Sequence, residues 1–263
     1  MKLQGKTIWI TGASSGIGEA LAIELSKKGN NLILSARRKE ALENVKSQLP
    51  HPEKAAIVVL DLTDSESFKE KYQEAKSFFG DIDVLVNNAG ISQRAWSHEA
   101  PLSVDRQVLE VNFFGAVGLT KMVLPDMLKN KSGQLIVISS VVGKYGFPMR
   151  TAYSASKHAL HGWYESLRLE HSKNGIEVTL VMPGRIKTNI SLNAIDKDGN
   201  KHGKLDKGQA EGIPADVCAR KIISATENKK REVFIGFKEA LLAHIKRVSP
   251  ALFHFIASRV NPT

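Results

Sequence analysis

Cysteine is almost absent from this chain, in which Cys218 is the only one among 263 residues. A single thiol excludes an internal disulfide framework and is compatible with a reducing compartment. We expect Cys218 to be a buried thiol without a chemical role. The scattered histidines show none of the spacings typical of zinc ligands, so no metal site is predicted.

Long apolar runs are also missing, because no run reaches the roughly 18 residues that a membrane span requires. The opening residues, Met1-Lys-Leu-Gln-Gly-Lys, lead directly into a short strand and do not resemble a secretory signal. The sequence therefore predicts a cytoplasmic protein.

Acidic residues are outnumbered, with 27 Asp and Glu against 37 Lys and Arg, which gives a net charge of +10. The basic residues are spread along the chain and form no recognition motif, so we do not expect nucleic-acid binding. A basic rim would instead steer anionic substrates or an acidic carrier protein toward a cleft.

Tyr153 and Lys157 stand four residues apart, and Ser140 precedes the tyrosine by thirteen residues. On a helix, a spacing of four places the phenol and the ammonium on one face. A neighbouring ammonium favours the phenolate and lowers the pKa of the phenol from its usual value of about 10. Tyr153 could then exchange a proton with a carbonyl or carbinol oxygen. The same spacing is common on helix surfaces, so this interpretation depends on the rest of the chain.

A glycine-rich segment, G-A-S-S-G-I-G, follows a short apolar strand at 6–11 and precedes an amphipathic helix that ends near Gly29. A strand, a glycine turn and a helix together aim free backbone N–H groups and the helix dipole at a phosphate. Gly12 permits the tight turn, Gly16 lets the backbone approach the ligand, and Gly18 lets the helix pack close to the strand. This context favours a dinucleotide site over an ordinary turn.

A second strand is expected at 31–36, and Arg37 and Arg38 follow it. In this kind of unit an acidic residue at that place selects NAD, whereas arginine accommodates the 2′-phosphate of NADP. A guanidinium pairs with phosphate through charge-assisted hydrogen bonds, so the sequence favours NADP(H). The alternative is that both arginines are solvated charges at the start of the next helix.

Apolar strands alternate with helices along the whole chain, without repeats, linkers or low-complexity tracts. Such alternation predicts an α/β fold, with a doubly wound parallel sheet of about seven strands covered by helices on both faces, in a single Rossmann-type domain over 1–263. The expected strands are 6–11, 31–36, 55–60, 82–87, 134–139, 176–182 and 232–235. The later helices are expected near 39–49, 65–79, 103–129, 151–173 and 214–227.

In this order and at these separations, the motifs resemble those of the short-chain dehydrogenase/reductase family over nearly the whole chain. The matching elements are T-G-A-S-S-G-I-G at 11–18, Asp61-Leu62, Asn87 to Gly90, Asn112, Ser140, Tyr153 with Lys157, and P-G-x-I-x-T at 183–188. The pair of arginines and the basic tail are most similar to the NADP-preferring, steroid- and retinoid-type reductases of that family.

The resemblance implies four catalytic roles. Tyr153 would be the general acid/base, and Lys157 would lower its pKa and hold the nicotinamide ribose. Ser140 would bind the substrate oxygen, and Asn112 would anchor a water in a proton relay. The serine before Ser140 is expected to be structural, and His158 and His161 are expected on the helix surface or at an interface.

The resemblance also implies the cofactor site. Asp61 and Leu62 would border the adenine, Asn88 to Gly90 the adenosine ribose, and Ile186 and Thr188 the carboxamide. The full set of cofactor-binding residues would be Gly12, Ser14, Ser15, Gly16, Ile17, Gly18, Arg37, Arg38, Asp61, Leu62, Asn88, Ala89, Gly90, Tyr153, Lys157, Pro183, Gly184, Ile186 and Thr188.

Two regions are expected to shape the substrate site. The polar segment 189–212 follows Thr188 and is rich in turn formers, which favours a substrate lid, with a flexible insertion as the alternative. The pocket walls are expected to be mainly apolar: Gln93 to Trp96, Val141, Val142, Tyr145, Phe147 and Met149.

The stretch 238–259 is amphipathic and basic. Three roles stay open: a helical tail docked on its own body near the substrate entrance, an oligomer contact in a homodimer or homotetramer, and a peripheral contact with anionic lipid.

The sequence thus predicts an NADP(H)-dependent oxidoreductase that transfers a hydride between nicotinamide and an apolar carbonyl or secondary alcohol. One alternative is reduction of a 3-oxoacyl group on an acidic carrier protein. An alternative of another class is a non-catalytic NADPH-binding sensor, which the intact Ser140, Tyr153 and Lys157 disfavour.

Overall fold

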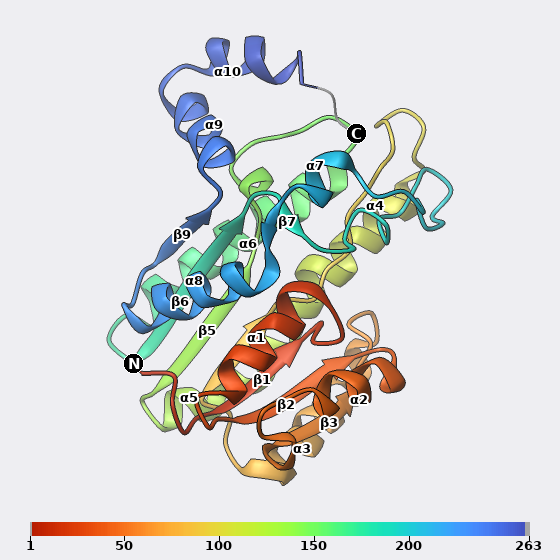
Figure 1. Cartoon of the computed structure of the whole chain (residues 1–263). Helices are drawn as coiled ribbons and strands as arrows, with labels where there is room; N and C mark the ends of the chain where they lie inside the picture. Colours follow the sequence, from red (N-terminus) through yellow and green to blue (C-terminus); the bar gives the residue numbers. More distant parts are fainter. Residues whose placement is uncertain (1, 261–263) are drawn as a thin grey trace.

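Seven parallel strands form one sheet, in the order β3-β2-β1-β4-β5-β6-β9, in the computed structural model, which describes residues 2–260 (Figure 1). The strands are β1 (Thr7–Thr11), β2 (Asn31–Ala36), β3 (Ala55–Val59), β4 (Val84–Asn87), β5 (Gly133–Ile138), β6 (Ile176–Pro183) and β9 (Glu232–Ile235). The predicted fold class is confirmed, and each strand lies within two residues of its predicted bounds.

The sheet is covered on both faces because its strands are apolar at nearly every position. In β1, Ile8 and Ile10 join one buried cluster, whereas Trp9 joins another. Successive side chains of a strand point to opposite faces, so a strand of this kind needs a helical layer on each side. Trp9 also donates a hydrogen bond to Ser35 Oγ (2.8 Å) and stacks on Tyr72, with 6.4 Å between ring centroids.

Three helices contribute buried side chains to each of these two clusters. The helices on the Ile8 side are α1 (Gly16–Ser26), α2 (Lys39–Ser47) and α8 (Ala215–Glu227). Those on the Trp9 side are α3 (Phe68–Phe79), α5 (Gly115–Lys129) and α6 (Thr151–Glu170). Short 3₁₀ turns lie at Pro52–Lys54, Ser65–Ser67 and Val141–Gly143.

The strand order reverses between β1 and β4, which are hydrogen-bonded neighbours. Open sheets of this type bind ligands outside the carboxyl ends of the strands at such a reversal. Gly12 directly follows β1 and Asn88 directly follows β4. The topology therefore brings two of the predicted cofactor segments together.

The helix predicted at 103–129 is interrupted. It begins as α4 (Leu102–Leu109), passes through a π turn at Glu110–Phe114 and continues as α5. Such π turns are frequent at functional sites, and this one carries Asn112. The sequence pattern missed the interruption because the apolar spacing continues through it.

The run Leu102–Lys129 is, by length and composition, the one candidate membrane span in the described part of the chain, with a mean hydropathy of 1.3 in a window that is 44% buried. It is not a continuous apolar run, because charged residues such as Glu110 and Lys121 interrupt it. Leu119 and Val123 of α5 are buried against the sheet. Core packing accounts for the apolar character of this helix, as it does in many core helices.

The tail folds back onto the body as α9 (Phe237–Val248) and α10 (Pro250–Ala257), beyond the carboxyl end of β9 (Figure 1). The rings of Tyr145 and Phe253 lie 5.4 Å apart, and Lys246 Nζ donates to the carbonyl oxygen of Lys144 (3.0 Å). Of the three roles left open, docking on the chain's own body is the one that these contacts support. Phe237 and Val248 remain 85% exposed.

Segment 189–212 has little regular structure besides α7 (Lys207–Ala210). At its base, β7 (Ile186–Lys187) pairs with β8 (Ile213–Pro214). Isolated bridges join Ile195 to Gln93 and to Lys201. These pairings hold the segment against the mouth of the sheet.

Candidate active site

A cleft of about 1340 Å³ lies at the carboxyl edge of the sheet and contains nearly all of the predicted site residues. The two exceptions are Gly18 and Asn112, which are not among the residues that line it. Residues of segment 189–212, including Asn193 and Asp206, line the same cleft. The structure therefore brings most of the predicted site residues together in one cleft.

The glycine loop has the geometry that its sequence requires. Gly12 (φ 64°) and Gly16 (φ 62°) adopt left-handed conformations that disfavour side chains. A Cβ added at Gly18 would collide with the carbonyl oxygen of Gly12 and lie 2.6 Å from Asn88 Nδ2. Asn88 Nδ2 also donates to the carbonyl oxygen of Thr11 (2.9 Å), so this loop is tied to the end of β4.

The other end of the cleft carries Arg37 and Arg38, which follow β2 and are exposed. Within residues 2–260, neither side chain has a hydrogen-bond or ion-pair partner. Asp61 Oδ1 accepts hydrogen bonds from Thr63 N (2.9 Å) and Thr63 Oγ1 (2.8 Å), which fixes the loop after β3. Two free guanidinium groups thus border the cleft where a phosphate could reach them.

Tyr153 and Lys157 lie on the same face of α6, one turn apart, and both are at least 90% buried. Lys157 Nζ lies 5.7 Å from the centroid of the Tyr153 ring and donates to the carbonyl oxygen of Ile138 (2.8 Å). Ser140, which follows β5, lines the cleft with them, and its side chain lowers the pKa of the Tyr153 phenol. The predicted trio is brought together.

The pKa of Tyr153 differs from the prediction. Burial raises the pKa of this phenol, and this effect outweighs the hydrogen bond from Ser140 and the charges of Arg94 and Arg150, which lower it. Burial also lowers the pKa of Lys157 to about 8. The expectation that the neighbouring ammonium brings the pKa of this phenol below its usual value is therefore wrong, because it left desolvation out.

Asn112 is held rigidly behind the cleft wall. Its Oδ1 accepts from Ile91 N (2.8 Å), and its Nδ2 donates to the carbonyl oxygen of Ile91 (2.9 Å) and to Ser156 Oγ (3.0 Å). A Cβ added at Gly90 would lie 3.0 Å from Asn112 Oδ1 and 3.4 Å from Lys157 Nζ. Gly90 therefore keeps open the space in front of both groups.

Three charged residues that sequence reasoning missed meet beside Tyr153. Arg94 Nη2 lies 2.6 Å and Arg150 Nη2 lies 3.1 Å from the same carboxylate oxygen, Asp206 Oδ2. All three line the cleft. Arg94 was expected only as part of a wall, and no local pattern connects it with Asp206.

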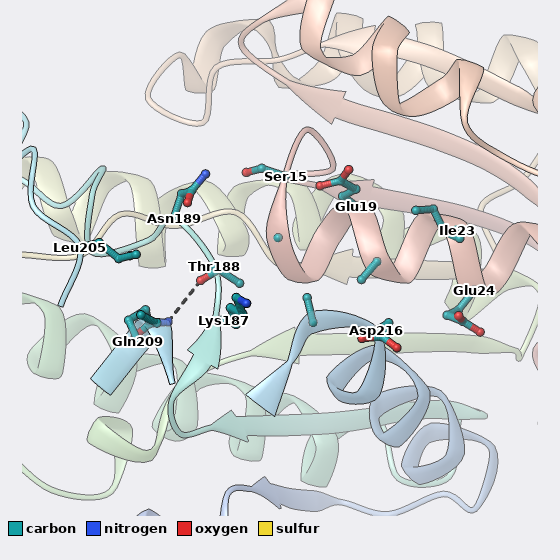
Figure 2. A pocket seen from close by; sticks show the side chains of 14 residues that line it. Ser15, Glu19, Ile23, Glu24, Lys187, Thr188, Asn189, Leu205, Gln209 and Asp216 are labelled. Carbon is teal, nitrogen blue, oxygen red and sulfur yellow. Dashed lines mark hydrogen bonds between the residues drawn. The ribbon is translucent and has the colours of Figure 1, made fainter. Parts of the chain in front are cut away.

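A second cavity of about 540 Å³ opens between α1, α7 and the start of α8 (Figure 2). Figure 2 shows Gln209 pointing to Thr188, and Gln209 Nε2 donates to Thr188 Oγ1 (3.2 Å). The same Nε2 is in close contact with the carbonyl oxygen of Ile186. Gln209 thus links segment 189–212 to a residue that was predicted to bind the carboxamide.

Comparisons with known proteins agree with this geometry. The family model for short chain dehydrogenases matches residues 6–199, more than half of the chain. The chain belongs to the short-chain dehydrogenase/reductase family. It is similar to "Dehydrogenase/reductase SDR family member 7B" of Xenopus tropicalis, with 39% identity over 98% of this chain and 87% of that protein.

Solved structures of family members share the fold. A short-chain dehydrogenase from Streptomyces avermitilis superposes with a TM-score of 0.82 at 30% identity, over 97% of this chain and 98% of that one. One from Burkholderia cenocepacia, described in complex with NADP, gives 0.81 at 25% identity over 98% and 99%. As a member of this family, the protein is an oxidoreductase that acts with a nicotinamide dinucleotide.

Two further expectations concern thiol and imidazole groups. Cys218 is buried, as predicted, and burial raises the pKa of its thiol to about 12.

His158 is exposed, but His161 is buried, so the surface position predicted for His161 is wrong. Its Nε2 contacts Ser139 Oγ (3.0 Å), and burial lowers the pKa of this histidine to about 4. Gly143 leaves room for the buried imidazole ring, since a Cβ at this position would lie 2.9 Å from His161 Nε2.

His161 also lies close to Glu165 and Glu232, although the sequence showed no pattern of metal ligands. Lys144 Nζ lies 2.9 Å from Glu232 Oε1 and 3.7 Å from Glu165 Oε1. An ammonium group therefore already pairs with these two carboxylates.

The predicted pocket walls are correct only in part. Arg94, Val141, Val142, Tyr145 and Phe147 line the cleft. The other predicted wall residues, Gln93, Ala95, Trp96 and Met149, do not line it. With three charged residues in the wall, the pocket is less apolar than expected.

Proposed function

We propose that this protein is an NADP(H)-dependent oxidoreductase that interconverts a carbonyl compound and a secondary alcohol, with Tyr153 as the general acid/base. The observation that carries the proposal is the arrangement of one cleft. Tyr153, Lys157 and Ser140 converge at one part of it, and Arg37 and Arg38 border another. When bound, the cofactor supplies the hydride, while the protein supplies orientation and electrostatics.

The chain has a cradle that fits such a cofactor. The left-handed Gly12 and Gly16 and the start of α1 would hold the pyrophosphate together with Ser14, Ser15 and Ile17. Asp61 and Leu62 would border the adenine, and Asn88 to Gly90 would border its ribose. Lys157 would hold the other ribose, and Ile186 and Thr188, after Pro183 and Gly184, would hold the carboxamide. Arg37 and Arg38 would bind the 2′-phosphate.

Proton transfer is assigned to Tyr153 Oη. In the reductive direction this hydroxyl gives its proton to the substrate oxygen, and Ser140 Oγ donates a second hydrogen bond to the same oxygen. Lys157, with its pKa near 8, retains most of its positive charge at neutral pH and stabilises the phenolate that is left. Asn112, fixed against Ile91, would anchor a water that returns the proton.

The substrate is proposed to be a small carbonyl or alcohol compound with an apolar portion, because Val141, Val142 and Phe147 line the cleft. Segment 189–212 is proposed to act as its lid, because it lines the cleft and contacts Thr188 through Gln209. Reduction of a 3-oxoacyl group on an acidic carrier protein remains the alternative that the net charge of +10 favours.

We also propose a cytoplasmic homodimer or homotetramer, in keeping with the single buried thiol, Cys218. The exposed Phe237 and Val248, next to the basic Lys238 and Arg247, leave a peripheral lipid contact as a further role of the tail.

The catalytic role is tested by NADPH and NADH oxidation with a panel of ketones, for the wild type and Tyr153→Phe. We expect turnover by the wild type, and NADPH binding without turnover by the variant. Binding by both forms with turnover by neither, across the whole panel, would support the non-catalytic sensor instead.

The cofactor preference is tested by Arg37→Asp, which removes a phosphate partner and adds a repulsive charge. We expect NADPH affinity to fall at least tenfold while NADH affinity changes little. Lys129→Asp, at the exposed end of α5, makes the same charge change elsewhere and serves as the control. Equal losses for the two cofactors would refute the phosphate role.

A further inference from the structure

Three segments that are distant in the sequence meet around one buried carboxylate. Arg94 lies in the stretch after β4, Arg150 directly precedes α6, and Asp206 belongs to the proposed lid. Arg94 donates through Nε (3.1 Å) and Nη2 (2.6 Å) to Asp206 Oδ2, and Arg150 donates to the same oxygen (3.1 Å). The side chains of Arg94, Arg150 and Asp206, which we call the arginine latch, are 3%, 11% and 11% exposed.

The two neighbours of Arg94 are hydrogen-bonded to the start of the helix that carries Tyr153 and to the residues just before it. Gln93 Oε1 accepts a hydrogen bond from Ala152 N (2.9 Å), and Ala95 N donates to the carbonyl oxygen of Met149 (3.2 Å). Met149 adopts φ 61°, a left-handed conformation that is unusual for a residue with a side chain. It turns the chain directly before Arg150, so this conformation helps to set the direction of the guanidinium.

Hydrogen bonds also hold the lid to the stretch that carries Arg94. Arg94 N donates to the carbonyl oxygen of Ile195 (2.8 Å), and Ile195 N donates to that of Ser92 (2.9 Å). Asp206 N donates to Ser191 Oγ (3.2 Å). The lid is therefore joined to the stretch after β4 by backbone bonds at one point and by the buried ion pairs at another.

We propose that Arg94 and Arg150 are positioning residues that stabilise the Tyr153 phenolate electrostatically, and that Asp206 fastens the lid by holding both guanidinium groups in place. This inference rests on the proposed function, in which Tyr153 exchanges the proton. It assigns a role in the reaction to the lid that goes beyond covering the substrate.

The charges around Tyr153 agree in sign with this role. The side chains of the latch carry two positive charges and one negative charge, and charges interact strongly where they are removed from water. Burial lowers the pKa of Arg150 to about 10, which still leaves it charged at neutral pH. Both arginines lower the pKa of Tyr153 and so oppose the effect of its burial.

The other groups near Tyr153 come from several elements. Lys157 lies on its own helix, and Ser140 and Tyr145 follow β5. Arg185 follows β6 and Glu239 lies on α9; both line the cleft, and their charges act on Tyr145 in opposite directions. Lys157 Nζ lies 5.7 Å from the centroid of the Tyr153 ring, and the latch adds two guanidinium groups to these surroundings.

The pH dependence of kcat/KM distinguishes a latch that only holds the lid from a latch that also stabilises the Tyr153 phenolate. Loss of a purely structural contact lowers kcat/KM by a similar factor at every pH. Loss of a cation that stabilises the phenolate raises the apparent pKa on which alcohol oxidation depends, because the phenolate is the base in that direction. The pH profile therefore separates the two.

The experiment compares pH profiles of kcat/KM for alcohol oxidation by the wild type, Arg94→Gln and Arg94→Lys. We expect Arg94→Gln to shift the apparent pKa upward by about one pH unit, with a roughly tenfold loss below it. Arg94→Lys keeps the charge and should recover most of the shift. Arg168→Gln, at a half-buried position in the last turn of α6 that does not line the cleft, removes the same charge and should leave the profile unchanged.

Asp206→Asn tests the other half of the proposal. Because this change removes no cation, we expect a raised KM from a loosened lid, without an upward shift of the apparent pKa. A uniform loss for Arg94→Gln at all pH values, or equal upward shifts for Arg94→Gln and Asp206→Asn, would overturn the latch's role. Full activity of Tyr153→Phe, measured in parallel, would instead overturn the proposed function and the latch with it.

Discussion

Replacing Lys157 with methionine should make the protein more stable while it abolishes activity. The Lys157 side chain is almost wholly buried, and its ammonium has one acceptor among the described residues, the carbonyl oxygen of Ile138. Burial lowers its pKa from 10.5 to about 8, which means that the charged ammonium destabilises the folded protein at neutral pH. Methionine has a similar length and no charge, so it removes this cost.

The size of the effect follows from the two pKa values. A difference of 2.5 pH units corresponds to about 3 kcal/mol of stability at neutral pH. The carbonyl oxygen of Ile138 loses its donor in the variant, which costs about 1 kcal/mol in return. We therefore expect a net gain of about 2 kcal/mol at pH 7.

The pH dependence has a definite sign. Below pH 8, Lys157 is charged in both states and the wild type bears the full cost of burying the charge. Between pH 8 and 10.5 the folded protein holds a neutral amine while the unfolded chain still binds the proton, so the wild type gains stability as the pH rises. The advantage of Lys157→Met should thus shrink by about 2 kcal/mol from pH 7 to pH 9.5.

Urea denaturation of both proteins at the two pH values measures this difference. Lys69→Met, at an exposed position of α3, is the matched control and should show no such dependence. If Lys157→Met were no more stable than the wild type at pH 7, or if its advantage did not change with pH, the inferred cost of burying this ammonium would be refuted.

Three further predictions concern the loop, the core and the thiol. Gly18→Ala should weaken cofactor binding and lower stability by several kcal/mol, measured by cofactor titration and urea denaturation, because its Cβ would collide with the backbone of Gly12. Tyr164→Phe should cost about 1–3 kcal/mol in urea denaturation, because the buried Asn87 Nδ2 loses an acceptor at 2.9 Å. Cys218 should resist thiol reagents in the native protein and react in urea, since burial raises its pKa to about 12.

The fold and most of the cleft could be predicted because their signals are local. A strand such as β1, whose three central residues are apolar and buried, requires cover on both faces wherever it lies. The conformations of Gly12 and Gly16 are dictated by a turn that contains both. Tyr153 and Lys157 share a helix face by spacing alone. Each of these inferences needs only a few neighbouring residues.

The remaining features depend on contacts between distant segments. Arg94 and Asp206 are 112 residues apart, and their ion pair exists only because the lid pairs with the stretch after β4, at Ile195 and Gln93. His161 was misplaced because a polar residue on a helix is usually exposed, and the space for it comes from Gly143 on another element. The π turn at Asn112 preserves the apolar spacing, so periodicity could not reveal it.

The pKa of Tyr153 depends both on local spacing, which the sequence shows, and on burial and distant contacts, which only the structure shows. Spacing identified Lys157 as a cation near the phenol, but it could not show that both groups are buried, which raises the pKa of one and lowers that of the other. Burial makes the phenol less acidic, yet it also strengthens every charge interaction at the same place. A single cation on the same helix is fixed, whereas Arg94 and Arg150 are held by a carboxylate of the proposed lid. The proposed lid is therefore anchored on the same side chains that supply positive charge near the general acid/base.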